Sequence, residues 1–372
     1  MRRLLKRLER AGKRLALRVL EWLVARHAAP GALAWDERPH RVLFLRHDRI
    51  GDMILSTGLI RAIAGSHPKL TLDVLASPIN APILRAEPAV GDVVVLDRTR
   101  PWTYPAVLRR LRRARYDAVV DCMVTAPSLT TLLLMLASGA RERIGVARDD
   151  NRSFYTVPLP PRADARHIVE HLSALLAAFG IEPARAKLEP RIVLTEDELR
   201  TGEERWRALA PETTRLRILV NVSSGKAARH WPDERFVAAI EHLRRRAPDA
   251  CIGLIGAPDE RERTLAIALR TGVEHVATPG IRDALALLAA ADLVFTPDTS
   301  IGHGASAFGK PAVVMFLDGK PPLWGLYGAP GWSLASPDQS LASLPLEPVL
   351  EALDALLERY GACPVMRPRL VS

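Results

Sequence analysis

FTPDTSIGHGASAFGKPAVVMF, residues 295–316, predicts the end of an apolar strand, a polar turn at 297–300, a short helix and a second apolar strand. Strand, polar turn, helix and strand are the layout of a ligand site at the carboxyl end of a parallel sheet. Unpaired N–H groups at the helix start would suit a phosphate, and Gly302 and Gly304 would let a ligand approach the backbone. An ordinary βαβ turn with capping residues is the alternative interpretation.

The same alternation of strands and helices extends in both directions from this stretch. Apolar strands are predicted at residues 41–46, 70–76, 92–96, 118–121 and 143–145 in the first half, and at 218–222, 251–255, 272–276 and 293–295 in the second. Helical patterns separate most of them, and a last helix is predicted at residues 346–359. We therefore expect an α/β protein with two doubly wound parallel sheets and a linker between them at residues 211–214.

The net charge of +10 is concentrated at the amino terminus. Residues 1–26 contain nine Lys or Arg and two Glu, which gives 9 − 2 = +7 and leaves +3 for the remaining residues. A nearly neutral body with few aromatic residues argues against a nucleic-acid binder. Three widely spaced cysteines, without a Cys/His cluster, argue against a disulfide framework or structural zinc.

Residues 2–26 predict a basic amphipathic helix, because Leu4, Leu8, Leu15 and other apolar residues recur every three or four positions. With Trp22 beside its apolar side, such a helix can lie in an anionic membrane interface. A helix packed on the body or on another subunit is the alternative. A cleaved signal peptide is disfavoured because Arg18 and Glu21 interrupt the apolar region.

Two further loops carry candidate chemistry. Asp52 ends the loop RHDRIGD, residues 46–52, at the carboxyl end of the first strand and at the start of a helix. A capping aspartate is the simpler interpretation, although capping and catalysis are compatible. In the loop after the strand at 218–222, Lys226 and Arg229 could clamp a diphosphate. The alternative interpretation of these two residues is a solvated loop whose charges have no common ligand.

Taken together, these segments resemble glycosyltransferase family 9, the bacterial heptosyltransferases of lipopolysaccharide core synthesis. The resemblance rests on RHDRIGD at 46–52, KAARHWPDERF at 226–236, LIGA at 254–257 and PDTSIGH at 297–303, and it covers about residues 41 to 350. It implies a GT-B fold, with two Rossmann-like domains facing across a cleft. The domains would be an amino-terminal helix (1–27), a linker (28–40), an acceptor domain (41–210), a nucleotide-sugar domain (211–345) and a closing helix and tail (346–372) that returns to the first domain.

The resemblance also implies residue roles in an inverting transfer of a sugar, expected to be heptose from ADP-heptose, to a glycolipid acceptor. Asp52 would be the general base, and Arg46 and Arg49 would bind the acceptor. The donor would be bound by Lys226, Arg229, Gly256, Asp259, Asp298, Thr299, Ser300, Gly302 and His303. No metal and no cofactor beyond the nucleotide-sugar co-substrate is expected. The protein would be cytoplasmic and peripheral on the inner membrane, through residues 2–26.

The sequence departs from the family pattern at two places. Ser300 and Ile301 stand where the family usually has Gly directly after Asp-Ser/Thr, and Gly follows at position 302. Pro258 interrupts the turn in which some members have a ribose-binding acid, which leaves Asp259 or Glu260 as substitutes. The alternatives are a nucleotide-sugar 2-epimerase and a non-catalytic, membrane-tethered binding protein.

Overall fold

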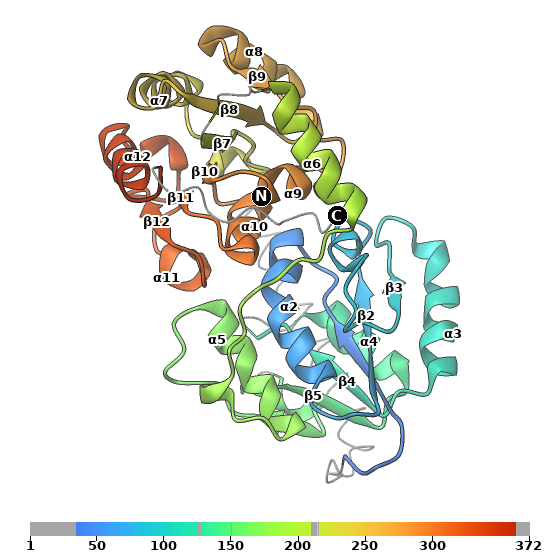
Figure 1. Ribbon diagram of the computed structural model, residues 1–372. Coiled ribbons are helices and arrows are strands. Elements are labelled where there is room, and N and C mark those ends of the chain that lie inside the picture. Colours follow the sequence, from blue (N-terminus) through green and yellow to red (C-terminus); the bar gives the residue numbers. More distant parts are fainter. Residues whose placement is uncertain (1–34, 125–127, 150, 210–213, 215, 362–372) are drawn as a thin grey trace, which may run out of the picture.

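The computed structural model describes residues 35–124, 128–149, 151–209, 214 and 216–361. Within these residues the chain forms two six-stranded parallel sheets, each in its own domain (Figure 1). This confirms the predicted α/β class and the pair of doubly wound sheets. The predicted amino-terminal helix lies outside the described residues.

The first sheet has the strand order β3-β2-β1-β4-β5-β6. Its strands are β1 (His40–Leu45), β2 (Leu70–Ala76), β3 (Val93–Val95), β4 (Ala118–Asp121), β5 (Glu142–Val146) and β6 (Val157–Leu159). Its helices are α2 (Ile50–Ala64), α3 (Tyr104–Ala114), α4 (Leu129–Ser138) and α5 (Ile168–Ser173). Val42 and Phe44 of β1 enter one hydrophobic core, and Leu43 and Leu45 enter the core on the opposite face. A strand covered on both faces must be apolar throughout, which explains its continuous apolar run.

The second sheet has the order β12-β11-β10-β7-β8-β9. Its strands are β7 (Leu216–Asn221), β8 (Ala250–Ile255), β9 (Glu274–His275), β10 (Leu293–Pro297), β11 (Ala312–Phe316) and β12 (Gly331–Ala335). Its helices are α7 (Asp233–Arg246), α8 (Arg261–Thr271), α9 (Ile281–Ala289), α10 (Ser300–Phe308), α11 (Pro321–Trp324) and α12 (Glu347–Tyr360). The opening stretch of the sequence therefore forms β10, α10 and β11, as predicted.

The domain boundary lies earlier than the sequence predicts. Helix α6 (Glu196–Leu209), expected at the end of the first domain, packs against α9 of the second. The fully buried Trp206 donates a hydrogen bond from Nε1 to the carbonyl of Leu287 at 2.9 Å. Gly202 lies so close to Ala286 that a Cβ there would clash with its carbonyl oxygen. The segment that precedes α6, rather than residues 211–214, connects the domains.

The closing helix α12 also differs from the prediction, because it packs on α7 and on the second sheet rather than on the first domain. Val349 and Leu353 are buried in the core of the second domain. On its polar side, Asp354 binds His242 and Arg246 of α7, each at 2.8 Å. Apolar burial and these ion pairs both hold α12 on the second domain.

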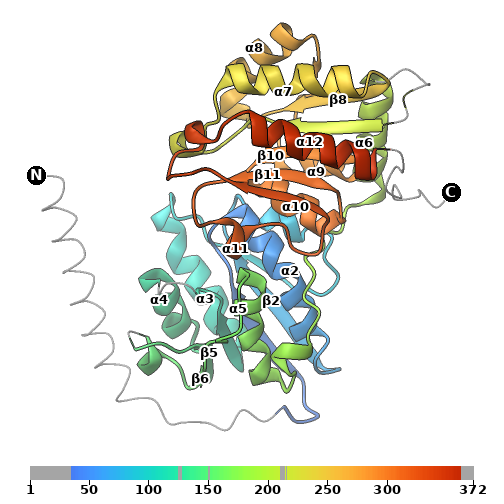
Figure 2. The same ribbon diagram turned by 90° about the vertical axis from the view of Figure 1, so that its left-hand side faces the viewer.

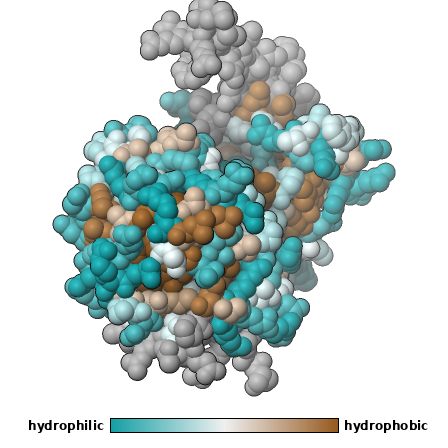
Figure 3. Space-filling view, turned by 90° about the horizontal axis from the view of Figure 1, so that it is seen from above, coloured by the Kyte–Doolittle hydropathy of each residue, from teal (hydrophilic) through white to brown (hydrophobic). Residues whose placement is uncertain are grey.

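The two domains meet where α10 lies against α2 (Figure 2). Leu55 and Leu59 of α2 share one hydrophobic core with Ile301 and Ala305 of α10. The opposite end of the second domain, where α7 and α8 lie in Figure 1, shows hydrophobic patches among hydrophilic side chains (Figure 3). At the domain interface, the contact between α2 and α10 brings the amino-terminal ends of these two helices toward each other.

Candidate active site

Asp52 lies in the first turn of α2, directly after the loop that leaves β1. Asn80 fixes this loop by donating from Nδ2 to the carbonyl of Arg46 at 3.0 Å. Ser77 donates to the carbonyl of Asp48 at 3.4 Å. Both supporting residues follow β2, so two neighbouring strands hold the loop at the carboxyl edge of the first sheet.

The turn before α10 is held by a small polar network. Thr299 caps the helix, because its Oγ1 accepts a hydrogen bond from the N–H of Ile301 at 3.3 Å. Asn221, at the end of β7, donates from Nδ2 to Oγ1 of Thr296 at 2.9 Å and of Thr299 at 3.1 Å. The first turn of α10, which begins at Ser300, is therefore oriented by side chains from two adjacent strands.

These two helix starts face each other across the domain interface. Gly51 lies directly against the imidazole of His303, and a Cβ at Gly51 would clash with His303 Cδ2. Arg229 binds Asp298 twice, through Nη2 to Oδ2 at 3.1 Å and through Nη1 to the carbonyl oxygen at 2.8 Å. His303 Nε2 lies 4.0 Å from Asp298 Oδ1. The structure thus brings Asp52, Arg229, Asp298 and His303 together from distant parts of the sequence.

The carboxyl group of Asp52 is unusual in its acidity. Its pKa is raised to about 6, chiefly by burial; the carboxylates of Asp48 and Asp298 also act to raise the pKa, whereas the charges of Arg46 and Arg49 act to lower it. The contribution from Asp298 shows that the two domains share one electrostatic environment. A carboxylate with a pKa near the working pH suits a general base.

Arg46 has a different role from the predicted acceptor contact. Its guanidinium is buried, with 3% of the residue exposed, and it donates to Ser56 Oγ at 2.9 Å and to Asp48 Oδ2 at 3.2 Å. It therefore supports the loop and supplies positive charge to Asp52, rather than presenting itself to a saccharide. Arg49 is exposed next to Asp52, and its predicted acceptor role stays a prediction.

Glu260 organises the loop that carries Lys226, and the sequence did not single it out over Asp259. Its Oε1 accepts hydrogen bonds from the N–H groups of Ser224 at 3.0 Å and Gly225 at 3.3 Å, and Oε2 binds Arg263 at 2.9 Å. Asp259 is exposed and makes no hydrogen bond or ion pair within the described residues. Lys226 is exposed as well.

The glycines of the site serve helix packing. Gly302 faces Val314 of β11, Gly304 faces Leu285 and Leu288 of α9, and a Cβ at Gly256 would clash with Thr264 of α8. The close approach predicted for a ligand is thus made by the protein's own side chains at Gly302 and Gly304. The N–H groups of the first turn of α10 are still oriented for an anion.

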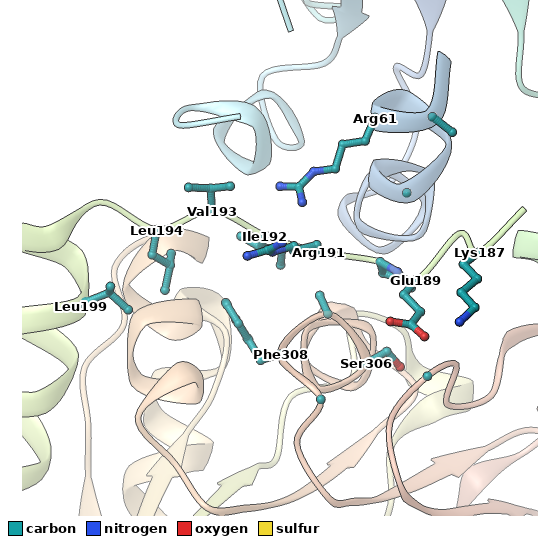
Figure 4. Close-up of a pocket in the computed structure, with 16 residues that line it drawn as sticks. Arg61, Lys187, Glu189, Arg191, Ile192, Val193, Leu194, Leu199, Ser306 and Phe308 are labelled. Atoms are coloured by element: carbon teal, nitrogen blue, oxygen red, sulfur yellow. The ribbon is translucent and has the colours of Figure 1, made fainter. Parts of the chain in front are cut away.

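A separate cavity of about 900 Å³ lies between the domains on the far side of the α2–α10 contact (Figure 4). The residues that line it include Arg61 of α2, Phe308 of α10, Lys187 and residues 189–194. None of the predicted site residues lines this cavity. We therefore assign the chemistry to the amino-terminal ends of the two helices. Among the described residues, no group of three or more His, Cys, Asp or Glu side chains could hold a metal ion.

Comparison with known proteins finds a matching family and several relatives. A family described as "Glycosyltransferase family 9 (heptosyltransferase)" matches residues 105–342, a range that contains Arg229 and Asp298 and begins after Asp52. Lipopolysaccharide heptosyltransferase 1 of Escherichia coli (strain K12) is 24% identical over 333 residues, which cover 85% of this chain and all of that protein. Lipopolysaccharide core heptosyltransferase OpsX of Haemophilus influenzae is 21% identical over 298 residues, 77% of this chain and 82% of that protein.

Solved structures share the fold. The glycosyltransferase family 9 structure from Veillonella parvula superposes with a TM-score of 0.75 at 17% identity and covers 89% of this chain and 99% of that one. E. coli heptosyltransferase WaaC with ADP superposes with a TM-score of 0.69 at 21% identity, over 85% of this chain and 99% of that one. Both cover the two domains together.

Proposed function

Because the chain belongs to glycosyltransferase family 9 (heptosyltransferase), a family of heptosyltransferase-type glycosyltransferases with the GT-B fold, we propose that it transfers heptose from ADP-heptose to a lipopolysaccharide core or related glycolipid. The observation that carries the proposal is Asp52, whose pKa is raised to about 6 and which shares its environment with Asp298 across the domain interface. One similar structure is described as WaaC with ADP and another as WaaC with ADP-2-deoxy-2-fluoro heptose, which supports ADP-heptose as donor.

In the proposed reaction, Asp52 accepts the proton of an acceptor hydroxyl while that oxygen attacks the anomeric carbon. The bond between this carbon and the phosphate oxygen breaks, and ADP leaves with the electron pair. A single attack from the face opposite the leaving group inverts the anomeric centre, and the transition state resembles an oxocarbenium ion. Base catalysis of this kind contributes about 10²–10⁴-fold to the rate.

The negative charge that develops on the diphosphate needs stabilisation in the second domain. The N–H groups at the start of α10 and the cations Arg229 and Lys226 are the groups we assign to it. Asp298 keeps Arg229 in position and would hydrogen-bond sugar hydroxyls. His303 of α10 is buried, burial lowers the pKa of its imidazole, and its Nε2 lies 4.0 Å from Asp298 Oδ1.

The test compares wild type with Asp52→Asn. We expect turnover of ADP-heptose with a glycolipid acceptor to fall by about 10²–10⁴-fold. The dissociation constant for ADP should change by less than about twofold, because Asp52 lies in the first domain. Turnover within tenfold of wild type would reject the base assignment. Donor binding by the wild type without any turnover would instead favour the non-catalytic binding protein.

A peripheral cytoplasmic location on the inner membrane is part of the proposal. No helix in the described part of the chain is long and apolar enough to span a membrane. The basic segment at residues 2–26 is the contact that the sequence predicts. Vesicle binding of the full chain and of an Arg10→Gln/Arg14→Gln variant would test this contact.

A further inference from the structure

The segment at residues 98–116 is strongly basic, since it contains seven arginines and neither Asp nor Glu. It comprises the end of the loop after β3, the turn Pro101–Thr103 and helix α3. Figure 1 shows α3 at the outer edge of the first domain, beside β3. We call residues 98–115 the arginine surface.

Helix α3 divides its side chains sharply between core and solvent. Leu111 is fully buried, and Val107 and Leu108 pack against the same core. Arg109 and Arg113 lie on the opposite side of the helix and are exposed. Every charged side chain on the outer face is therefore an arginine.

Few of these arginines are neutralised. Arg100 pairs with Asp97 at 3.3 Å and Arg110 pairs with Asp92. Within the described residues, Arg98, Arg113 and Arg115 form no ion pair, and Arg109 donates only to the carbonyl of Pro105 in its own helix. The surface thus retains a net positive charge that an anionic partner can neutralise.

Most of the exposed large hydrophobic side chains lie in the same domain as this charge. Of the five large hydrophobic residues that are exposed in the described part of the chain, Ile79, Val95, Trp102 and Leu133 belong to the first domain. Trp102, 73% exposed, lies in the turn before α3. Val95 ends β3 and pairs with Ala76 at the end of β2, three residues before Ile79. Tryptophan beside arginine is typical of side chains at the level of lipid headgroups.

We propose that the arginine surface and Trp102 form a second membrane contact, which binds anionic phospholipid headgroups. Trp102 follows the carboxyl end of β3, and Asp52 follows the carboxyl end of β1 in the same parallel sheet. A bilayer that contacts Trp102 would therefore lie near the edge of the sheet at which Asp52 lies. The contact would bring a membrane-borne acceptor to this edge of the sheet. This purpose rests on the proposed function, whereas the proposed binding of lipid does not depend on it.

The test measures binding of the full chain to vesicles of phosphatidylcholine with and without phosphatidylglycerol, in the absence of donor and acceptor. We expect salt-sensitive binding to the anionic vesicles. Arg109→Gln/Arg113→Gln should reduce the partition coefficient by about 30-fold, since each basic residue near an anionic leaflet contributes roughly a factor of five. The control is Arg207→Gln/Arg245→Gln, which removes the same charge from exposed positions on the second domain.

Each outcome decides the proposal. Equal vesicle binding by the two double variants would overturn it, and so would a loss of binding confined to the Arg10→Gln/Arg14→Gln variant. Loss of binding to a single-stranded DNA oligonucleotide without loss of vesicle binding would assign the surface to nucleic acid instead. Trp102→Ala should weaken vesicle binding several-fold at any salt concentration, because the ring contributes an apolar contact.

Measurements of turnover distinguish a failure of the proposed membrane contact from a failure of the proposed function. Arg109→Gln/Arg113→Gln should keep wild-type turnover with a short, water-soluble acceptor and lose it with an acceptor embedded in anionic vesicles. Asp52→Asn should bind vesicles as wild type does. Vesicle binding without turnover in the wild type would support the surface and reject the proposed function.

Discussion

Replacement of Asp52 by Asn should stabilise the folded protein, and the gain should depend on pH. The pKa of Asp52 is raised from 3.8 to about 6 in the folded protein, chiefly by burial. The native state therefore holds the proton more tightly than the unfolded state does. The contribution of Asp52 to the free energy of unfolding therefore falls as the pH rises from about 4 to about 6. Above that range the ionised carboxylate lowers the free energy of unfolding by ~3 kcal/mol, since each unit of pKa shift corresponds to ~1.4 kcal/mol. Asn cannot ionise, so the variant avoids this cost.

The assay is denaturant unfolding of wild type and variant near pH 4 and near pH 8. We expect the free energy of unfolding of the Asn variant to exceed that of wild type by up to ~3 kcal/mol at the higher pH and by much less at the lower pH. Asp259→Asn, at an exposed position in the second domain, is the control and should leave stability unchanged. A stability difference that is the same at both pH values, or an Asn variant that is the less stable one near pH 8, would refute the reasoning.

The same carboxylate should govern the pH dependence of catalysis. If Asp52 is the base, only its ionised form is active, and kcat/KM should fall about tenfold per pH unit below about pH 6. Asp298→Asn should move this inflection to lower pH, because the charge of Asp298 raises the pKa of Asp52. An inflection that stays in place would show that the two carboxylates do not share a site.

Four further outcomes are expected. Arg229→Ala should weaken ADP binding by about 10- to 100-fold in calorimetry, because a charge-assisted contact is lost, whereas the exposed Arg261→Ala should not. Gly51→Ala should lower turnover, because its Cβ clashes with His303 at the domain interface, and a normal rate would contradict that packing. Trp206→Ala should cost about 3–5 kcal/mol in denaturant unfolding, since its buried ring and its hydrogen bond are both lost. Chelation with EDTA should leave turnover unchanged, and a loss restored by a divalent ion would reject the predicted metal independence.

Much of the fold was predictable because its signals are local. Strands buried on both faces read as continuous apolar runs, and β1 and β10 were both predicted in this way. The weak signals were those of short edge elements. Strands β6 (Val157–Leu159) and β12 (Gly331–Ala335) pair on one side only and were not predicted. Both strands are short, Pro158 stands inside β6, and Gly331 begins β12.

The main carboxylates of the candidate site were predictable from the sequence, whereas the residues that hold the surrounding loops were harder to predict. The spacing of polar residues after apolar strands pointed to Asp52 and Asp298, and the structure brings them into one electrostatic environment. Glu260 was not preferred to Asp259, because both follow the same strand, and only the fold decides which carboxylate turns toward the loop. Arg46 was assigned to the acceptor because sequence does not show burial.

The sequence by itself determined the long apolar strands, the loops that follow their carboxyl ends and the positions of the charges, because these depend on residues within a few positions of one another. Only the tertiary structure decided that α6 and α12 pack on the second domain and that Gly51 admits His303. The raised pKa of Asp52 and the exposure of Trp102 to solvent also follow only from the tertiary structure. Burial and electrostatic environment depend on residues that are distant along the chain, and these come together only when the two domains pack.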